Sequence, residues 1–185
     1  MIAHPPGCVQ SQSALQFGAV ERPHISIRAA SLQDAEAIAE IYNQGILDRV
    51  ATLETELRDA VERRRWLEAR GPRHPVIVAE ADGAVVGWGS LNSFNSRRAY
   101  DHVADFSVYV ERSWRGRGVG GRLLADLIER ARRAAYHKLV LAAFPFNDAG
   151  VALYERFGFT RVGIYREQGQ LDGKWVDVLL MEKLL

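Results

Sequence analysis

The residues with the clearest chemical potential form a glycine-rich run, Arg115-Gly116-Arg117-Gly118-Val119-Gly120-Gly121. Glycines at alternate positions let a backbone adopt positive φ angles and approach a ligand closely. The run leads directly into an amphipathic segment, so the unpaired N–H groups and the positive dipole end of a helix would face the same ligand. A phosphate or pyrophosphate is the expected ligand, with Arg115 and Arg117 adding positive charge. The alternative is an ordinary glycine-containing connection between a strand and a helix.

Two common phosphate-binding motifs can be compared with this run. Gly116, Gly118 and Gly121 satisfy the pattern G-x-G-x-x-G, but a dinucleotide fold also needs an acid about twenty residues later, at the end of the next strand. Here the next strand ends at Ala143 without a carboxylate. A P-loop needs Lys and then Ser or Thr at the end of the loop, whereas Arg122 follows the last glycine. Neither motif fits.

A strand and a helix must position the glycine run. Residues 103–110 alternate in polarity and are rich in β-branched and aromatic side chains, which predicts a strand. From Gly120 onward, apolar residues recur every three or four positions, which predicts an amphipathic helix. Those residues are Leu123, Leu124, Leu127, Ile128, Ala131 and Ala134.

Upstream of residue 103, the pattern alternates between strands and helices. Ser31, with Asp34 in a capping-box-like position, should begin a helix whose core face is Ala35, Ile38, Ala39 and Tyr42. Residues 43–56 show no sustained period and are expected to form a loop. Asp59 should cap a second helix that runs to Arg70, with Val61, Trp66 and Leu67 facing inward. Strands are expected at 25–29, 76–81 and 85–91, the last two forming a hairpin about Asp82-Gly83, and a polar loop at 92–101.

Downstream of the glycine run, the expected strands are 138–143, 160–166 and 174–183. A helix at 148–157 should end at Gly158. This order of elements, with no internal repeat, predicts a mixed α/β sheet.

Composition indicates one soluble domain. The 185 residues are 48% hydrophobic with a net charge of +1, which is enough chain for a sizeable core and too little charge for a polyanion partner. We expect no nucleic-acid partner and, without a long apolar run, no membrane partner. Cys8 is the sole cysteine, and no spacing of His, Asp or Glu suggests a metal. Residues 1–24 lack the apolar core of a secretory signal, so we expect a flexible N-terminal extension, a domain at 25–185 and a cytoplasmic location.

Two motifs in the expected order resemble a known superfamily. Arg115-x-x-Gly118-x-Gly120, after the strand at 103–110, resembles the acetyl-CoA loop of the GNAT superfamily of acyl-CoA-dependent N-acyltransferases. Residues 147–159 resemble its second signature, N-x-x-A-x-x-L-Y-E-x-x-G-F. The resemblance covers about residues 25–185. It implies an α/β (α+β) fold: a mixed, mostly antiparallel six- to seven-stranded sheet flanked by four helices, with the co-substrate acetyl-CoA in a cleft at the central strands.

Within that superfamily, the chain is most similar to the small-molecule amino-acid acetyltransferases that detoxify phosphinothricin, arsinothricin and methionine sulfoximine. The matching segments are 41–43, 52–56, 98–101, 108–110, 165–169 and 175–178, and residues 104–107 and 144–147 look most like the arsinothricin-resistance branch. The chain departs from the pattern of the phosphinothricin enzymes at two positions. Leu53 stands where they usually have Phe in the substrate loop, and Asp105 stands where they have Glu. The resemblance implies acetylation of the α-amine of a glutamate-like antimetabolite, which confers resistance.

Asp105 is the expected proton acceptor, because an ammonium must lose a proton before it can attack a thioester. Transfer from an amine of pKa about 8 to a carboxylate of pKa about 3.9 is uphill by about four units, roughly 5 kcal/mol. Asp105 should therefore act through a water or with a pKa raised by burial. The alternative is a structural carboxylate.

The resemblance assigns the remaining roles. Tyr154 would protonate the leaving thiolate, or else be a core aromatic, and Asn147 would contact the pantetheine arm or cap its helix. The implied cofactor-binding residues are Val108, Tyr109, Val110, Arg115, Gly116, Arg117, Gly118, Val119, Gly120, Gly121 and Asn147. The expected substrate-binding residues are Leu53, Glu54, Arg97, Arg98, Tyr100, Lys174 and Trp175, near the interface of a homodimer; Arg97 and Arg98 are alternatively plain surface charge. Two other functions stay open: N-acetylation of a protein or another small amine, and a non-catalytic acyl-CoA sensor.

Overall fold

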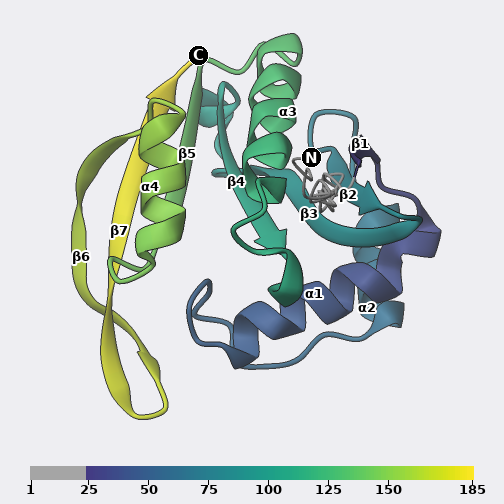
Figure 1. Cartoon of the computed structure of the whole chain (residues 1–185). Coiled ribbons are helices and arrows are strands. Elements are labelled where there is room, and N and C mark those ends of the chain that lie inside the picture. Colours follow the sequence, from purple (N-terminus) through teal and green to yellow (C-terminus); the bar gives the residue numbers. More distant parts are fainter. Residues whose placement is uncertain (1–23) are drawn as a thin grey trace, which may run out of the picture.

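A computed structural model describes residues 24–185 (Figure 1), and the predicted extension at 1–24 lies almost entirely outside them. The described residues form a seven-stranded sheet in the order β1-β2-β3-β4-β5-β7-β6. The strands are β1 (Ile25–Ala29), β2 (Val76–Ala81), β3 (Ala84–Ser93), β4 (Val103–Val110), β5 (Lys138–Ala143), β6 (Thr160–Leu171) and β7 (Lys174–Leu184). The α-helices are α1 (Ala35–Leu47), α2 (Ala60–Glu68), α3 (Val119–Arg133) and α4 (Asp148–Arg156). Short 3-10 turns lie at Leu32–Asp34, Arg98–Tyr100 and Arg112–Trp114.

Helices cover both faces of the sheet. Alternation along β2 makes the division clear, because successive side chains of a strand point to opposite faces. Ile77 and Ala79 belong to the apolar cluster that contains the buried leucines of α3. Val76 and Val78 belong to a second cluster with Ile38 and Ile41 of α1. The sheet therefore separates α3 from α1, and Val151 of α4 joins the α3 side.

The centre of the sheet has one parallel pair, β4 with β5, and every other neighbouring pair is antiparallel. This parallel pairing is short. It joins Val103, Ala104 and Asp105 to Lys138, Leu139 and Val140, and it ends there. The second half of β4 stays paired with β3 as far as Val110, but its opposite edge, on the β5 side, has no strand partner among the described residues.

The predicted sheet and hairpin are confirmed. The bounds predicted for β1, β2, β4 and β5 agree with the structure, and Asp82 and Gly83 both take positive φ (51° and 79°), as a tight hairpin turn requires. The mixed, mostly antiparallel sheet with four helices also agrees with the prediction.

Four local predictions are wrong. The polar loop expected at 92–101 begins late, because β3 continues to Ser93 through its pairing with β4. The expected loop at 43–56 begins late because α1 continues to Leu47, where burial of Ile46 extends the helical apolar stripe. Val61 does not face inward, since its side chain is 58% exposed on the outer face of α2. The strand expected at 160–166 runs to Leu171, because a bulge between Tyr165 and Gly169 interrupts its alternation without ending its pairing with β7.

Candidate active site

A pocket of about 430 Å³ opens where β4 and β5 part. Four parts of the chain line it: the second half of β4, the end of β5 with the start of α4, the loop after α1, and the β6–β7 hairpin. The lining residues are Ala51, Thr52, Leu53, Asp105, Phe106, Ser107, Val108, Tyr109, Leu141, Ala142, Ala143, Phe144, Asn147, Tyr154, Tyr165, Gln168, Val178 and Leu180. In Figure 1, α4 lies in front of β5 and β7, and the long hairpin of β6 and β7 extends beyond the rest of the sheet.

Asp105 lies at the last position of β4 that pairs with β5, where the pocket begins. Burial raises the pKa of its carboxyl from 3.8 to about 6, and a hydrogen bond donated by Asn92 Nδ2 to Asp105 Oδ1 (3.3 Å) opposes that rise. Desolvation dominates because water that would stabilise the charge is excluded. The carboxyl is therefore a better proton acceptor than an exposed aspartate, yet it is still mostly ionised at neutral pH.

Tyr154 approaches the same pocket from α4. Its ring packs edge-on against Phe106 and Phe159, with ring centres 5.8 Å and 6.1 Å away. Phe106 and Asp105 are consecutive in β4, so their side chains leave opposite faces of the strand. Burial, with a smaller effect of the Asp105 charge, raises the pKa of Tyr154 to about 12, which keeps its phenol protonated at neutral pH. A carboxyl group and a protonated phenol thus line one opening from two sides of the sheet.

The unpaired edge of β4 borders this opening. Beyond Asp105, the backbone groups of β4 that point toward β5 have no ladder partner in the described sheet. Val108 and Tyr109 line the pocket along this edge. An extended chain with amide groups could pair with such an edge in the manner of an added strand.

The glycine run forms the turn into α3. Gly116 and Gly118 have φ of 76° and 87°, a region that residues with a Cβ rarely adopt. Gly118 is the N-cap and supplies no capping side chain, and Arg122 N is the first amide with an acceptor there, Gly118 O at 3.2 Å. The amides of residues 119–121 therefore point out of the helix end, where an anion is favoured.

Other residues of the run have structural contacts as well. Arg115 Nη1 donates to Asp48 Oδ2 (2.6 Å), which ties the turn to the end of α1. Arg117 is exposed, with its guanidinium 5.4 Å from the ring centre of Trp114. The Cα of Gly120 faces Leu153 of α4 so closely that an added Cβ would lie 3.3 Å from its methyl group. The run therefore brings α3 against α4 in addition to presenting amides.

Asn147 is the N-cap residue of α4. Its Oδ1 accepts a hydrogen bond from Gly150 N (3.1 Å), so it caps the helix, and the residue also lines the pocket. The two roles considered for Asn147 are compatible in one position.

The expected substrate residues are not brought together. Leu53 lines the pocket and packs on β6, where an added Cβ on Gly169 would lie 2.9 Å from its methyl groups. The Glu54 carboxylate accepts hydrogen bonds from backbone amides of its own loop and does not line the pocket. The other expected residues are exposed and lie outside the pocket lining: Arg97, Arg98 and Tyr100 near the 3-10 turn at Arg98–Tyr100, and Lys174 and Trp175 at the start of β7.

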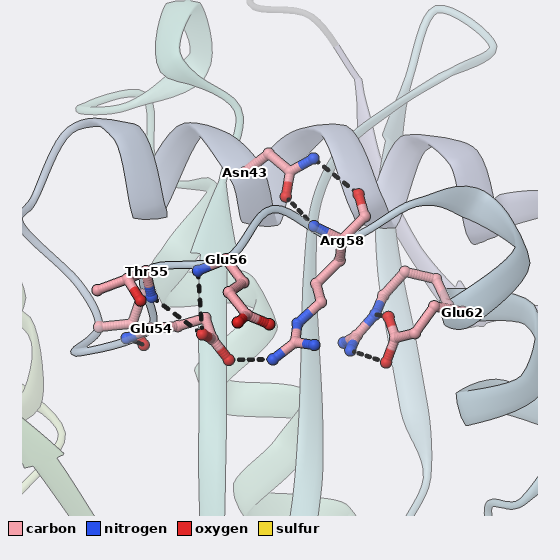
Figure 2. Close-up of polar contacts among 8 residues, drawn as sticks. Asn43, Glu54, Thr55, Glu56, Arg58 and Glu62 are labelled. Carbon is pink, nitrogen blue, oxygen red and sulfur yellow. Dashed lines mark hydrogen bonds and ion pairs between the residues drawn. The ribbon is translucent and has the colours of Figure 1, made fainter.

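Figure 2 shows how the loop after α1 is fixed. Asn43 Nδ2 donates to Arg58 O (2.8 Å), and Arg58 N donates to Asn43 Oδ1 (2.9 Å), so one side chain clamps the far end of the loop onto α1. Glu54 Oε1 accepts from the amides of Thr55 (2.9 Å) and Glu56 (3.1 Å), and Glu54 Oε2 pairs with the Arg58 guanidinium. This network holds residues 51–53 against the pocket.

Sequence reasoning gave no role to Thr52, Ser107, Tyr165 or Gln168, although all four line the pocket. The bulge between Tyr165 and Gly169 sets several residues of β6 against a shorter stretch of β7. Bulges of this kind often change the direction of side chains next to active sites. The available signal was Gly169 inside an otherwise strand-like segment, which is typical of a bulge.

Within residues 24–185, no three His, Cys, Asp or Glu side chains gather as they would to hold a metal ion. The helices of the same residues are too short or too polar to cross a membrane.

Comparisons with known proteins identify relatives of similar sequence and fold. Residues 36–159 match the model of the acetyltransferase (GNAT) family. The L-methionine sulfoximine/L-methionine sulfone acetyltransferase of Salmonella typhimurium is 34% identical over 85% of this chain and 93% of that protein. A crystal structure of a ribosomal-protein-alanine N-acetyltransferase from Brucella melitensis is 38% identical, with a TM-score of 0.84 over 86% of this chain and 99% of that one. A GNAT superfamily phosphinothricin acetyltransferase from Sinorhizobium meliloti, in complex with acetyl-CoA, is 29% identical, with a TM-score of 0.82 over 87% of this chain and 88% of that one.

Proposed function

Because this chain belongs to the acetyltransferase (GNAT) family, we propose that it transfers the acetyl group of acetyl-CoA to the α-amine of a glutamate-like amino acid. Methionine sulfoximine, phosphinothricin and arsinothricin are the proposed acceptors, and their acetylation would confer resistance on the cell. The names of the Salmonella typhimurium and Sinorhizobium meliloti proteins support the first two acceptors. Arsinothricin rests on the sequence resemblance of residues 104–107 and 144–147.

One observation carries this proposal: the unpaired edge of β4, Asp105 and Tyr154 all meet at the opening between β4 and β5. The amides at the start of α3 would hold the pyrophosphate of acetyl-CoA. The edge of β4 at Val108, Tyr109 and Val110 would pair with the pantetheine arm. Bound there, acetyl-CoA supplies the thioester that the acceptor amine attacks.

Asp105 then acts as the base. It takes a proton from the acceptor's ammonium, directly or through one water, so that the nitrogen lone pair becomes available. With the carboxyl pKa at about 6 and the amine pKa at about 8, the transfer is uphill by about two units, roughly 3 kcal/mol, instead of the four units of an exposed aspartate. The C–N bond forms and the C–S bond breaks. Tyr154 gives its proton to the departing thiolate, and the phenolate that remains takes up the second proton, which the nitrogen loses as it becomes an amide.

The pocket's size and polarity suit a small acceptor. Its volume of about 430 Å³ is within the usual range for sites that enclose small molecules. Among the lining residues, Thr52, Ser107 and Gln168 offer neutral hydrogen-bonding groups, and none is Lys or Arg. We propose that the acceptor's acidic end extends from the pocket toward Arg97 and Arg98, which can bind an oxyanion bidentately.

A homodimer is the second part of the proposal. Large apolar side chains are exposed on the outer hairpin, with Val162, Ile164 and Trp175 each more than half exposed. Burying such side chains against a second copy would be favourable. The dimer would place Lys174 and Trp175 at a shared boundary, and light scattering at micromolar concentration tests it. Since acetyl-CoA is an intracellular metabolite, the cytoplasm is the proposed location.

A thiol-release assay tests the proposed reaction. Purified protein is given acetyl-CoA with phosphinothricin, methionine sulfoximine, arsinothricin, ordinary amino acids or a peptide with an N-terminal alanine. Turnover with the glutamate-like compounds, and much less with the peptide, is the expected result. Preference for the peptide would instead favour protein acetylation, the activity named for the Brucella melitensis protein. No turnover with any acceptor, despite acetyl-CoA binding, would favour a sensor.

A further inference from the structure

We infer that Asn92, itself held by Arg70, is a positioning residue that orients the Asp105 carboxylate and keeps it ionised for catalysis. This inference rests on the proposed function of Asp105 as the base. It assigns a role in the reaction to a side chain on β3 and to an arginine beyond the end of α2, neither of which lines the pocket.

The sheet register places the polar groups. Asn92 of β3 lies directly opposite Asp105 of β4, and Ser90 lies opposite Ser107. Side chains two residues apart on a strand share a face, so these four form a compact polar group on the α1–α2 side of the sheet. Ser90 is almost fully buried, and Asn92, Asp105 and Ser107 are partly buried. Buried polar groups need hydrogen-bond partners, so the hydrogen bonds among these four residues determine how their side chains are oriented.

The orientation of the Asn92 amide follows from its partners. Asn92 Oδ1 accepts hydrogen bonds from Arg70 Nη2 (3.0 Å) and from Ser90 Oγ (3.0 Å). The arginine identifies that atom as the oxygen, because a guanidinium can only donate and an NH₂ group could not accept from it. Asn92 Nδ2 is therefore turned toward Asp105 Oδ1 and Ser107 Oγ, each 3.3 Å away.

Arg70 is fixed independently of Asn92. Its Nε donates to His74 O (2.8 Å), its Nη2 also donates to Leu91 O, and its guanidinium lies 4.8 Å from the ring centre of Trp66. A guanidinium remains charged in proteins. Its charge polarises the Asn92 amide toward Asp105, although the arginine does not touch the carboxylate itself.

The consequence for Asp105 is twofold. One carboxylate oxygen is bound by Asn92, which leaves the other available to the pocket. The donated hydrogen bond also stabilises the ionised form, so it limits how far burial raises the pKa. The other titratable groups around Asp105 are phenols: Tyr154 from α4, Tyr109 from β4 and Tyr165 from β6, all on the pocket wall. In addition to these phenols, the positive charge of Arg70 acts on Asp105 through the Asn92 amide that lies between them.

The test measures the titration of Asp105 directly. Carbon-detected NMR follows the side-chain carboxyl of Asp105 from pH 4 to 9 in wild type and in Asn92→Ala. Loss of one hydrogen bond to a charged group should raise the Asp105 pKa by about one unit or more. Arg70→Met should shift it in the same direction by less, because the amide donor remains. Ser93→Ala, at an exposed side chain of β3, and Arg64→Met, at an exposed side chain of α2, should leave it unchanged.

The same shift should appear in the reaction. If Asp105 is the base, the acid limb of kcat/KM against pH moves upward in Asn92→Ala by the amount that NMR records. An unchanged Asp105 pKa in folded Asn92→Ala would overturn the inference, whatever the activity. A shifted pKa with an unmoved acid limb would instead contradict the role of Asp105 as the base, and hence the proposed mechanism. Thermal melting of each variant identifies any that fails to fold, and Asn92→Ser then serves as the milder replacement.

Discussion

Asp105→Asn should produce a protein that is more stable and almost inactive at neutral pH. The substitution keeps the size of the side chain and its hydrogen bond from Asn92, but it removes the charge. The native state holds the Asp105 proton more tightly than the unfolded chain does, since burial raises the carboxyl pKa from 3.8 to about 6. Stability therefore falls as pH rises through that window, and it stays lower at every pH above it.

The size of the effect follows from that difference. Each pKa unit corresponds to 1.36 kcal/mol, so the ionised carboxylate costs up to about 3 kcal/mol of folding free energy above pH 6. For a domain of this length, 1 kcal/mol changes the Tm by roughly 2–4 °C. Asp105→Asn should therefore raise the Tm at pH 7.5 by up to about 6–12 °C, and the gain should vanish near pH 4. Turnover should fall by about 10²-fold or more, because the general base is lost.

The assay pairs thermal melting with thiol release at several pH values. Asp101→Asn, a change at an exposed aspartate of the same region, is the matched control and should show neither effect. Equal turnover in wild type and Asp105→Asn would remove this residue from the mechanism. A stability gain that did not depend on pH would contradict the explanation by desolvation.

Three other substitutions test separate parts of the site. Gly118→Val should weaken acetyl-CoA binding, measured by isothermal titration calorimetry, about tenfold or more, because a φ of 87° strains a β-branched residue. Gly71→Val, at an open position without positive φ, is the control and should leave the affinity unchanged. Equal affinities of the two variants would refute a role of the turn at Gly118 in binding acetyl-CoA. Tyr154→Phe should lower kcat about 10²-fold with an unchanged Tm, because only the hydroxyl is lost, and full activity would exclude the phenol as the acid. Asn43→Ala removes the two hydrogen bonds to the Arg58 backbone, so the free energy of unfolding in urea should fall by about 1–3 kcal/mol. KM should rise more for the acceptor than for acetyl-CoA. Unchanged values would show that these hydrogen bonds are dispensable.

Much of the central fold could be predicted because its signals are local. The alternation of residues 103–110, the apolar run at 138–143 and the Asp82-Gly83 turn each specify a structure within a few residues, and the structure agrees. The end of α1 and the length of β6 could not be predicted in the same way. Burial of Ile46 and the pairing of β6 with β7 across its bulge depend on contacts with distant segments.

The site divides along the same line. Asp105, Tyr154 and the glycine run could be identified because strand, helix and motif positions are visible in the sequence. That β4 and β5 separate after Asp105 is a property of long-range pairing, as is the partnership of Arg115 with Asp48. Asn92 is one more such case, because only the register of β3 against β4 places it opposite the carboxylate.

A crystal structure of the protein with bound coenzyme A tests the central claim most directly. The claim predicts the pyrophosphate on the amides of residues 119–121, the pantetheine arm along the free edge of β4, and the sulfur in the opening between Asp105 and Tyr154. Coenzyme A bound elsewhere, with the gap between β4 and β5 closed by the protein's own side chains, would contradict it.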